Sequence, residues 1–143
     1  MTFKKDLEFG NKYEQELINY LGYDEYKIMK GCFKDYDVEI NINGTIKYFE
    51  VKADRLMKKT NNICIEFECS NIKSGIETTK ADYYAYYEVI DETKHNLYMI
   101  PVSRIRKNIL NKSYHKIIYG GDNGKSRFYL FNKDIYSKYL IEI

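Results

Sequence analysis

Three side chains suited to metal-assisted hydrolysis lie close together in the sequence, namely Asp37, Glu50 and Lys52. Two carboxylates offer the hard oxygen ligands by which Mg²⁺ is commonly held, together with water and substrate phosphate. A lysine beside them can orient a water molecule or stabilise negative charge that develops in a reaction. These residue types suit phosphate chemistry, provided that the fold brings them together.

The segment that carries these residues has the pattern of a β-hairpin. Alternating runs at 36–42 and 45–53 flank Asn43-Gly44. This pair favours a type I′ turn, because both central positions of that turn need positive φ. We therefore predict two antiparallel strands joined by a two-residue loop, which sets the pairing of every residue in them.

The predicted register gathers charged residues on one face of the hairpin. Its largely apolar face has the pairs Ile42–Thr45, Ile40–Lys47, Val38–Phe49 and Tyr36–Val51. Its other face has Asp37 opposite Glu50, and Asp35 opposite Lys52. Two opposed carboxylates repel each other unless a positive charge lies between them, and a divalent cation would supply it. An ordinary edge hairpin with exposed charges is the alternative.

A helix is predicted before the hairpin, from about Asp6 to Leu21. At about 100° per residue, its apolar stripe contains Leu7, Gly10, Leu17, Ile18 and Leu21. Glu14 projects from the middle of this stripe. A carboxylate directed into a core is costly unless it is paired, protonated or bound to a metal. Glu14 therefore either joins the metal site or is satisfied by a buried Lys or Tyr.

The rest of the chain predicts further strands and few helices. Strands are expected at 62–69, 83–90 and 97–100, a helix from Pro101 to about Leu110, a hairpin from 116–119 and 127–131, and a final helix from about Lys133. This order favours an α/β (α+β) fold with a mixed β-sheet flanked by helices, and we expect residues 1–143 to form a single domain.

The combination of Asp37 with Glu50-Val51-Lys52 resembles the PD-(D/E)XK nuclease superfamily. The signature of that superfamily is an acidic residue at the end of one strand and (D/E)-x-K on the next. Tyr36 stands where the motif has its proline. The resemblance covers roughly residues 10–90 and implies a restriction-endonuclease-like αβββαβ core.

The stretch 10–17, with Glu14 after a glycine, also resembles the first helix of archaeal-type Holliday-junction resolvases, which belong to that superfamily alongside phage and restriction-type endonucleases. The resemblance implies that Glu14, Asp37, Glu50 and Lys52 are catalytic. It further implies that Asp37, Glu50 and the Val51 carbonyl hold Mg²⁺ (or Mn²⁺), and that the products carry 5′-phosphate and 3′-hydroxyl ends.

Basic and hydroxyl-bearing residues outside the motif are candidates for DNA contacts. Residues 1–93 carry 13 basic and 18 acidic side chains, whereas residues 94–143 carry 10 and 3 and form a basic C-terminal extension of the core. The nucleic-acid-binding candidates are Ser74, Thr78, Thr79, Lys80, Arg104, Arg106, Lys107, Lys125 and Arg127. A plain connection at 74–82 and solvated basic side chains are the alternatives.

Several classes of protein are not indicated. Residues 120–126 lack the spacing of a phosphate-binding GxxxxGK[ST] loop, so no nucleotide cofactor is expected. Cys32, Cys64 and Cys69 lack the spacing of a zinc site or a disulfide framework, and we take them as reduced core residues. No apolar run has the length of a membrane span. We expect a cytoplasmic protein, in the host cytoplasm if the protein is phage-encoded, with no membrane partner.

The sequence thus predicts a Mg²⁺-dependent DNA endonuclease that hydrolyses phosphodiester bonds in branched or structured DNA, and we expect it to form a homodimer. The preference for branched DNA rests on the resemblance of the first helix alone. A restriction-type or phage DNA-degrading nuclease is one alternative, because fold and metal site do not determine substrate. A non-catalytic DNA-binding protein on the same fold is another.

Overall fold

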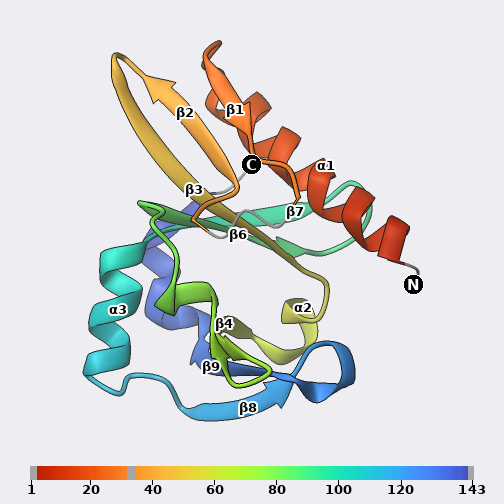
Figure 1. The fold of residues 1–143 in the computed structure, drawn as a ribbon, viewed down its shortest axis with the longest axis vertical. Helices are drawn as coiled ribbons and strands as arrows, with labels where there is room; N and C mark the ends of the chain where they lie inside the picture. The colour runs from red at the N-terminus through yellow and green to blue at the C-terminus, as the bar shows by residue number, and fades with distance from the viewer. Residues whose placement is uncertain (1–2, 32–34, 142–143) are drawn as a thin grey trace.

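The computed structural model describes residues 3–31 and 35–141, whose strands form two sheets (Figure 1). In chain order the elements are α1 (Phe3–Leu21), β1 (Tyr26–Ile28), β2 (Val38–Ile42), β3 (Thr45–Asp54), α2 (Met57–Thr60), β4 (Asn62–Cys69), β5 (Ile72–Lys73), η1 (Gly75–Glu77), β6 (Tyr83–Val89), β7 (His95–Pro101), α3 (Val102–Leu110), β8 (Lys116–Gly120), η2 (Asp122–Gly124), β9 (Ser126–Asn132), η3 (Lys133–Tyr139) and β10 (Leu140–Ile141). The chain is therefore a mixed α/β protein.

The larger sheet has the strand order β1-β2-β3-β6-β7-β10, with β3 and β6 parallel and the other neighbours antiparallel. Helix α1 covers one face of this sheet, and Tyr13 and Leu17 are buried there against Phe49. The smaller sheet, β5-β4-β9-β8, covers the other face (Figure 1), where Ile65 joins a core that includes Tyr86. The larger sheet thus carries a core on each face.

The predicted hairpin register is confirmed over β2 and β3. Asn43 and Gly44 have φ values of 53° and 91°, which is the positive φ that a type I′ turn requires. Val38 lies opposite Phe49, as predicted. Tyr36 departs from the prediction, because the β2 ladder begins only at Val38 and the Tyr36 ring packs on Tyr48, with ring centres 4.5 Å apart, instead of facing Val51.

The first helix begins at Phe3, earlier than predicted, and ends at Leu21 as predicted. Among the side chains described for this helix, those of Tyr13, Leu17 and Ile18 are buried, so the apolar stripe is centred on the Tyr13 side. Gly10 was wrongly placed in the stripe and is exposed. The side chain of Leu7 lies outside the described part of the chain.

The sheet that contains β4 and the end of the chain differ from the prediction. β4 was expected to join one mixed sheet, but it pairs with β5 and β9 in the smaller sheet. The segment from Lys133 was expected to be helical, and it forms the 3₁₀ helix η3, but the chain then continues into the short strand β10, which pairs with β7. The hairpin of β8 and β9 is confirmed.

Other sequence expectations can be placed on the described residues. Cys64 and Cys69 are free and half-buried, whereas Cys32 lies outside the described residues. Among the helices described, none has both the length and the apolar character needed to cross a membrane.

Candidate active site

Glu50 is a buried carboxyl group in the middle of β3, with 7% of the residue exposed. The Thr79 hydroxyl donates a hydrogen bond of 2.8 Å to its Oε1, and Lys52 Nζ lies 4.0 Å from its Oε2. Burial and then the Asp37 carboxylate raise the pKa of Glu50 to about 7, although Lys52 and Thr79 act in the opposite direction. At neutral pH this carboxyl group is therefore poised between its two protonation states.

Asp37 comes directly before β2, where the β2–β3 ladder ends, and its carboxylate binds the backbone of β3. Its Oδ2 accepts a hydrogen bond of 2.8 Å from the backbone N–H of Val51. A side chain thus takes the place of the backbone acceptor that a longer β2 would have supplied. Because the N–H and C=O of one strand residue point to the same side of the strand, the Val51 carbonyl faces the same side of β3 as its N–H. Asp37 and Glu50 therefore lie close together, as predicted. Their proximity comes from the bond between the Asp37 side chain and the Val51 backbone, and not from a regular cross-strand pair.

Glu14 approaches the same place from α1, on the opposite face of the sheet. Burial and then the Asp37 carboxylate raise the pKa of Glu14 to about 7, while Lys52 lowers it. The Asp37 charge therefore acts on Glu14 and on Glu50, and the Lys52 charge acts on both as well. The four residues that the sequence singled out as catalytic form one electrostatic cluster at the edge of β3.

Tyr84 belongs to the site but was not identified from the sequence. It lies opposite Glu50 in the parallel ladder of β3 and β6, and only 1% of the residue is exposed. Its hydroxyl has no hydrogen-bond partner within the described part of the chain. Burial, followed by the charges of Glu50 and Asp37, raises its pKa. A local pattern could not reveal this residue, because parallel neighbours are far apart in the chain.

The donor set suits a hard divalent cation. In residues 3–31 and 35–141, no three His, Cys, Asp or Glu side chains are arranged to hold a metal among themselves. Mg²⁺ needs only one or two carboxylates when waters and a substrate phosphate complete its shell. Asp37, Glu50 and the Val51 carbonyl fit that requirement. The buried Tyr84 hydroxyl, which feels the charges of Glu50 and Asp37, lacks a protein partner among the described residues. It can therefore form a hydrogen bond with a water molecule or another group bound at this site.

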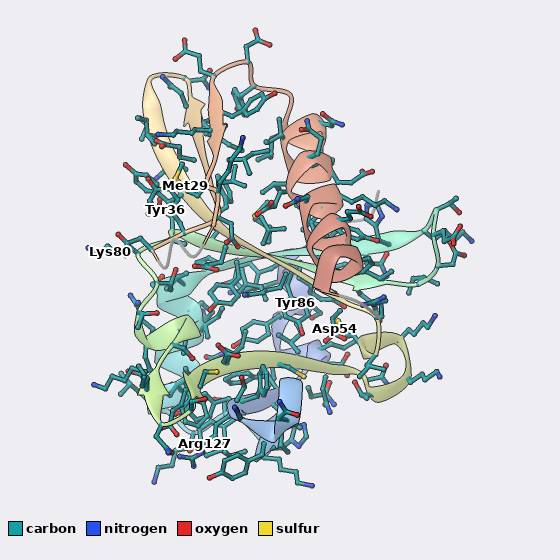
Figure 2. The ribbon with its side chains drawn as sticks, turned by 45° about the vertical axis from the view of Figure 1, so that its right-hand side comes forward. Met29, Tyr36, Asp54, Lys80, Tyr86 and Arg127 are labelled. Carbon is teal, nitrogen blue, oxygen red and sulfur yellow. The ribbon has the colours of Figure 1, made fainter. Side chains whose placement is uncertain are left out.

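The loop before β6 supports Glu50. Thr79 was expected to contact DNA, but only 3% of the residue is exposed and its hydroxyl lies 2.8 Å from Glu50 and 3.0 Å from the Asp35 carbonyl. Lys80, whose side chain is exposed at the side of the molecule (Figure 2), lies 3.7 Å from the Asp35 carboxylate. Asp35 thus contacts this loop rather than facing Lys52. The structure makes Thr79 a buried support of Glu50 and leaves Lys80 at the surface.

The first part of the same loop packs closely on β4. A side chain at Gly75, which has a φ of 54°, would place its Cβ 2.1 Å from the Glu66 carbonyl oxygen, so glycine is required there. The Ser74 hydroxyl donates a hydrogen bond of 2.9 Å to Glu66, and Thr78 donates one of 3.3 Å to the Gly75 carbonyl. The hydroxyls of Ser74 and Thr78 thus have partners within the loop and β4.

The three basic candidates on α3 have different surroundings. Arg106 donates hydrogen bonds to the carbonyls of Ile76 and Thr79, at 3.2 and 2.9 Å, and so braces the loop that supports Glu50. Arg104 donates one of 3.3 Å to the Tyr139 hydroxyl. Lys107 is exposed on the last turn of the helix. Arg106 is exposed as well, whereas Arg104 is half-buried.

The remaining two basic candidates lie on the smaller sheet. Lys125 is exposed at the tip of the β8–β9 hairpin. Arg127 pairs with Glu68 at 3.8 Å, and its guanidinium lies over the rings of Phe67 and Tyr119. The Phe67 carbonyl accepts a hydrogen bond of 3.1 Å from the Ser74 N–H, so Arg127 lies beside the start of the loop that carries Thr79.

Comparison with protein families, with curated proteins and with solved structures found no match.

Proposed function

We propose that this protein is a Mg²⁺- or Mn²⁺-dependent deoxyribonuclease of the PD-(D/E)XK kind that acts on branched or otherwise structured DNA. The observation that carries the proposal is the meeting of Asp37 and Glu50 at the edge of β3, with Lys52 4.0 Å from Glu50. Two like charges held this closely in a partly buried position favour a cation. The proposal includes the αβββαβ core, of which α1, the β2–β3 hairpin and β6 would supply the first helix and three strands.

The side chains have separate roles in this proposal. A divalent cation held by Asp37, Glu50 and the Val51 carbonyl would supply the positive charge that a phosphate needs in the transition state. Lys52 orients the attacking water or stabilises the negative charge that develops. Glu14 completes the acidic surroundings from α1, and Thr79 holds the Glu50 carboxyl group in place.

The proposal is tested by incubating the protein with labelled four-way junction, duplex, flap, single-stranded DNA and RNA. Mg²⁺ or Mn²⁺ should support cleavage, EDTA should abolish it, and Ca²⁺ should support binding with little turnover. Paired symmetric cuts in the junction would support a resolvase. Sequence-specific or uniform cutting of duplex would support a restriction-type or DNA-degrading nuclease. Robust cleavage in excess EDTA would contradict the metal site, and binding without cleavage would indicate a non-catalytic protein.

The proposal extends to a homodimer, because symmetric cutting of a junction needs two catalytic centres. Sizing of the protein with and without junction DNA tests this part separately. A monomer in both conditions would remove the dimer while leaving the metal-dependent chemistry in place.

A further inference from the structure

A pocket of about 360 Å³ opens beside Lys52, at the end of β3. Its lining residues come from four strands, β3, β4, β6 and β9, and from the turn after β3, and they include Lys52, Asp54, Arg55, Cys64, Tyr86 and Phe128. Asp54 and Tyr86 lie together between the larger sheet and β4 (Figure 2). Lys52, Asp54 and Glu50 alternate along β3 and so face the same side of the sheet. The pocket therefore continues the candidate catalytic face.

The floor of this pocket is a buried hydrogen-bond network. The Tyr86 hydroxyl donates a hydrogen bond of 2.6 Å to Asp54 Oδ2 and accepts one of 3.0 Å from the backbone N–H of Cys64. Asp54 Oδ1 accepts hydrogen bonds from the N–H groups of Leu56 and Met57 at 2.8 and 3.0 Å. Only 2% of Tyr86 is exposed. These bonds link β3, β4 and β6, and they keep the floor rigid and polar.

The walls combine an aromatic ring with cations. Phe128 packs over Gly120 of β8, where an added Cβ would lie 3.2 Å from the ring, so the absence of a side chain at Gly120 makes room for this ring position. Lys52 brings positive charge to the rim, and Arg55 lines it as well, with its guanidinium 4.1 Å from the centre of the Phe9 ring of α1. Aromatic rings beside basic residues are the features on which proteins stack the bases of single-stranded nucleic acid while they bind its phosphates.

We propose that this pocket binds one unstacked nucleobase of the DNA strand being cut, next to the phosphate at Lys52. This inference rests on the proposed function. A pocket of this volume is in the size range of small-molecule sites, and a base can enter it only after leaving the duplex stack. Unstacking costs least for a base that is already unpaired. The protein therefore selects DNA that has an unpaired nucleotide beside the cut.

The inference is tested with duplexes that carry one unpaired nucleotide at successive positions, each compared with the fully paired duplex and with an abasic residue at the same position. The unpaired base should raise kcat/KM by about tenfold at one fixed distance from the cut, and the abasic residue should remove this gain. Phe128→Leu should abolish the difference between unpaired and paired substrates, and Phe128→Tyr should retain it. Tyr20→Leu, at an exposed tyrosine of α1, is the matched control.

A second readout does not depend on cleavage. DNA with 2-aminopurine at the unpaired position should change its fluorescence when it binds the Glu50→Gln variant. The change should be lost with the double variant Glu50→Gln/Phe128→Leu. Thermal melts show whether each variant is folded. If paired and unpaired substrates are cleaved equally well at every position, the inference is overturned and the proposed function is unaffected. If no DNA is cleaved by the parent, the proposed function fails, and the fluorescence result alone decides whether the pocket takes a base.

Discussion

At the scale of single residues, Asp37 joins two carboxyl groups that approach from opposite faces of the larger sheet. Its Oδ2 is fixed by the Val51 N–H, and its charge raises the pKa of both Glu14 and Glu50. A cluster of this kind holds protons at neutral pH in the absence of metal. Binding of a cation would displace them, so metal affinity should rise with pH.

Lys52 provides the most direct test of the chemistry. Lys52→Ala should lower the rate of cleavage by at least about a hundredfold, which is the scale of losing a positioned proton-transfer or charge-stabilising group, while DNA affinity changes little. Single-turnover rates and binding constants measured on the same substrate separate the two effects. An equal loss of binding and cleavage would make Lys52 a phosphate anchor instead.

Glu50→Gln tests the protonation of the site through stability. The pKa of Glu50 is raised from 4.5 to about 7 in the folded chain, so the folded state binds more protons than the unfolded state between these values. The stability of the metal-free protein should therefore fall as pH rises from about 4.5 through 7, and Glu50→Gln should reduce this fall. At pH 8 without metal the variant should be as stable as the parent or more stable.

Adding Mg²⁺ should reverse that order at pH 8. A ligand that binds only the native state stabilises it, and the variant has lost one ligand charge. Thermal melts at pH 5 and pH 8, with and without Mg²⁺, measure both effects, and cleavage should be lost in the variant. A Glu50→Gln protein that cleaves normally with an unchanged metal response would falsify the site.

At the scale of elements, the loop between η1 and β6 connects α3 to the candidate site. Arg106 holds the carbonyls of Ile76 and Thr79, and Thr79 holds Glu50. Arg106→Ala should therefore lower kcat by about tenfold with a smaller change in KM, the scale of losing hydrogen bonds to a charged group. The neighbouring Lys107→Ala should mainly raise KM. If both variants change only KM, Arg106 contacts DNA and does not position the loop.

At the scale of the whole molecule, two exposed lysines of the C-terminal extension are candidates for phosphate contacts: Lys107 on α3 and Lys125 at the tip of the β8–β9 hairpin. If Lys107 and Lys125 each neutralise one phosphate, the double alanine variant should weaken binding to all DNA substrates similarly. The slope of log affinity against log salt concentration should shrink by about 0.9 for each phosphate that is no longer neutralised. Titrations at several salt concentrations measure this, and an unchanged slope would show that neither lysine touches DNA.

The sequence by itself determined the features that depend on neighbouring residues. Asn43-Gly44 defined the turn, and the alternation around it set the pairing of Val38 with Phe49 that the structure has. The period of the helix correctly predicted that Glu14 lies on the inner side of α1, but it wrongly placed Gly10 there. These features follow from local periodicity and turn geometry, which act over a few residues and are therefore visible in the sequence.

Only the tertiary structure decided what surrounds the candidate site. The parallel pairing of β3 with β6 brought Tyr84 beside Glu50, and the loop before β6 brought Thr79 to the same carboxyl group. The separation of β4 into a second sheet created the pocket beside Lys52. Such contacts join segments that are distant in the chain. Which segments pair depends on the free energy of packing the two cores, so no local sequence pattern specifies these contacts.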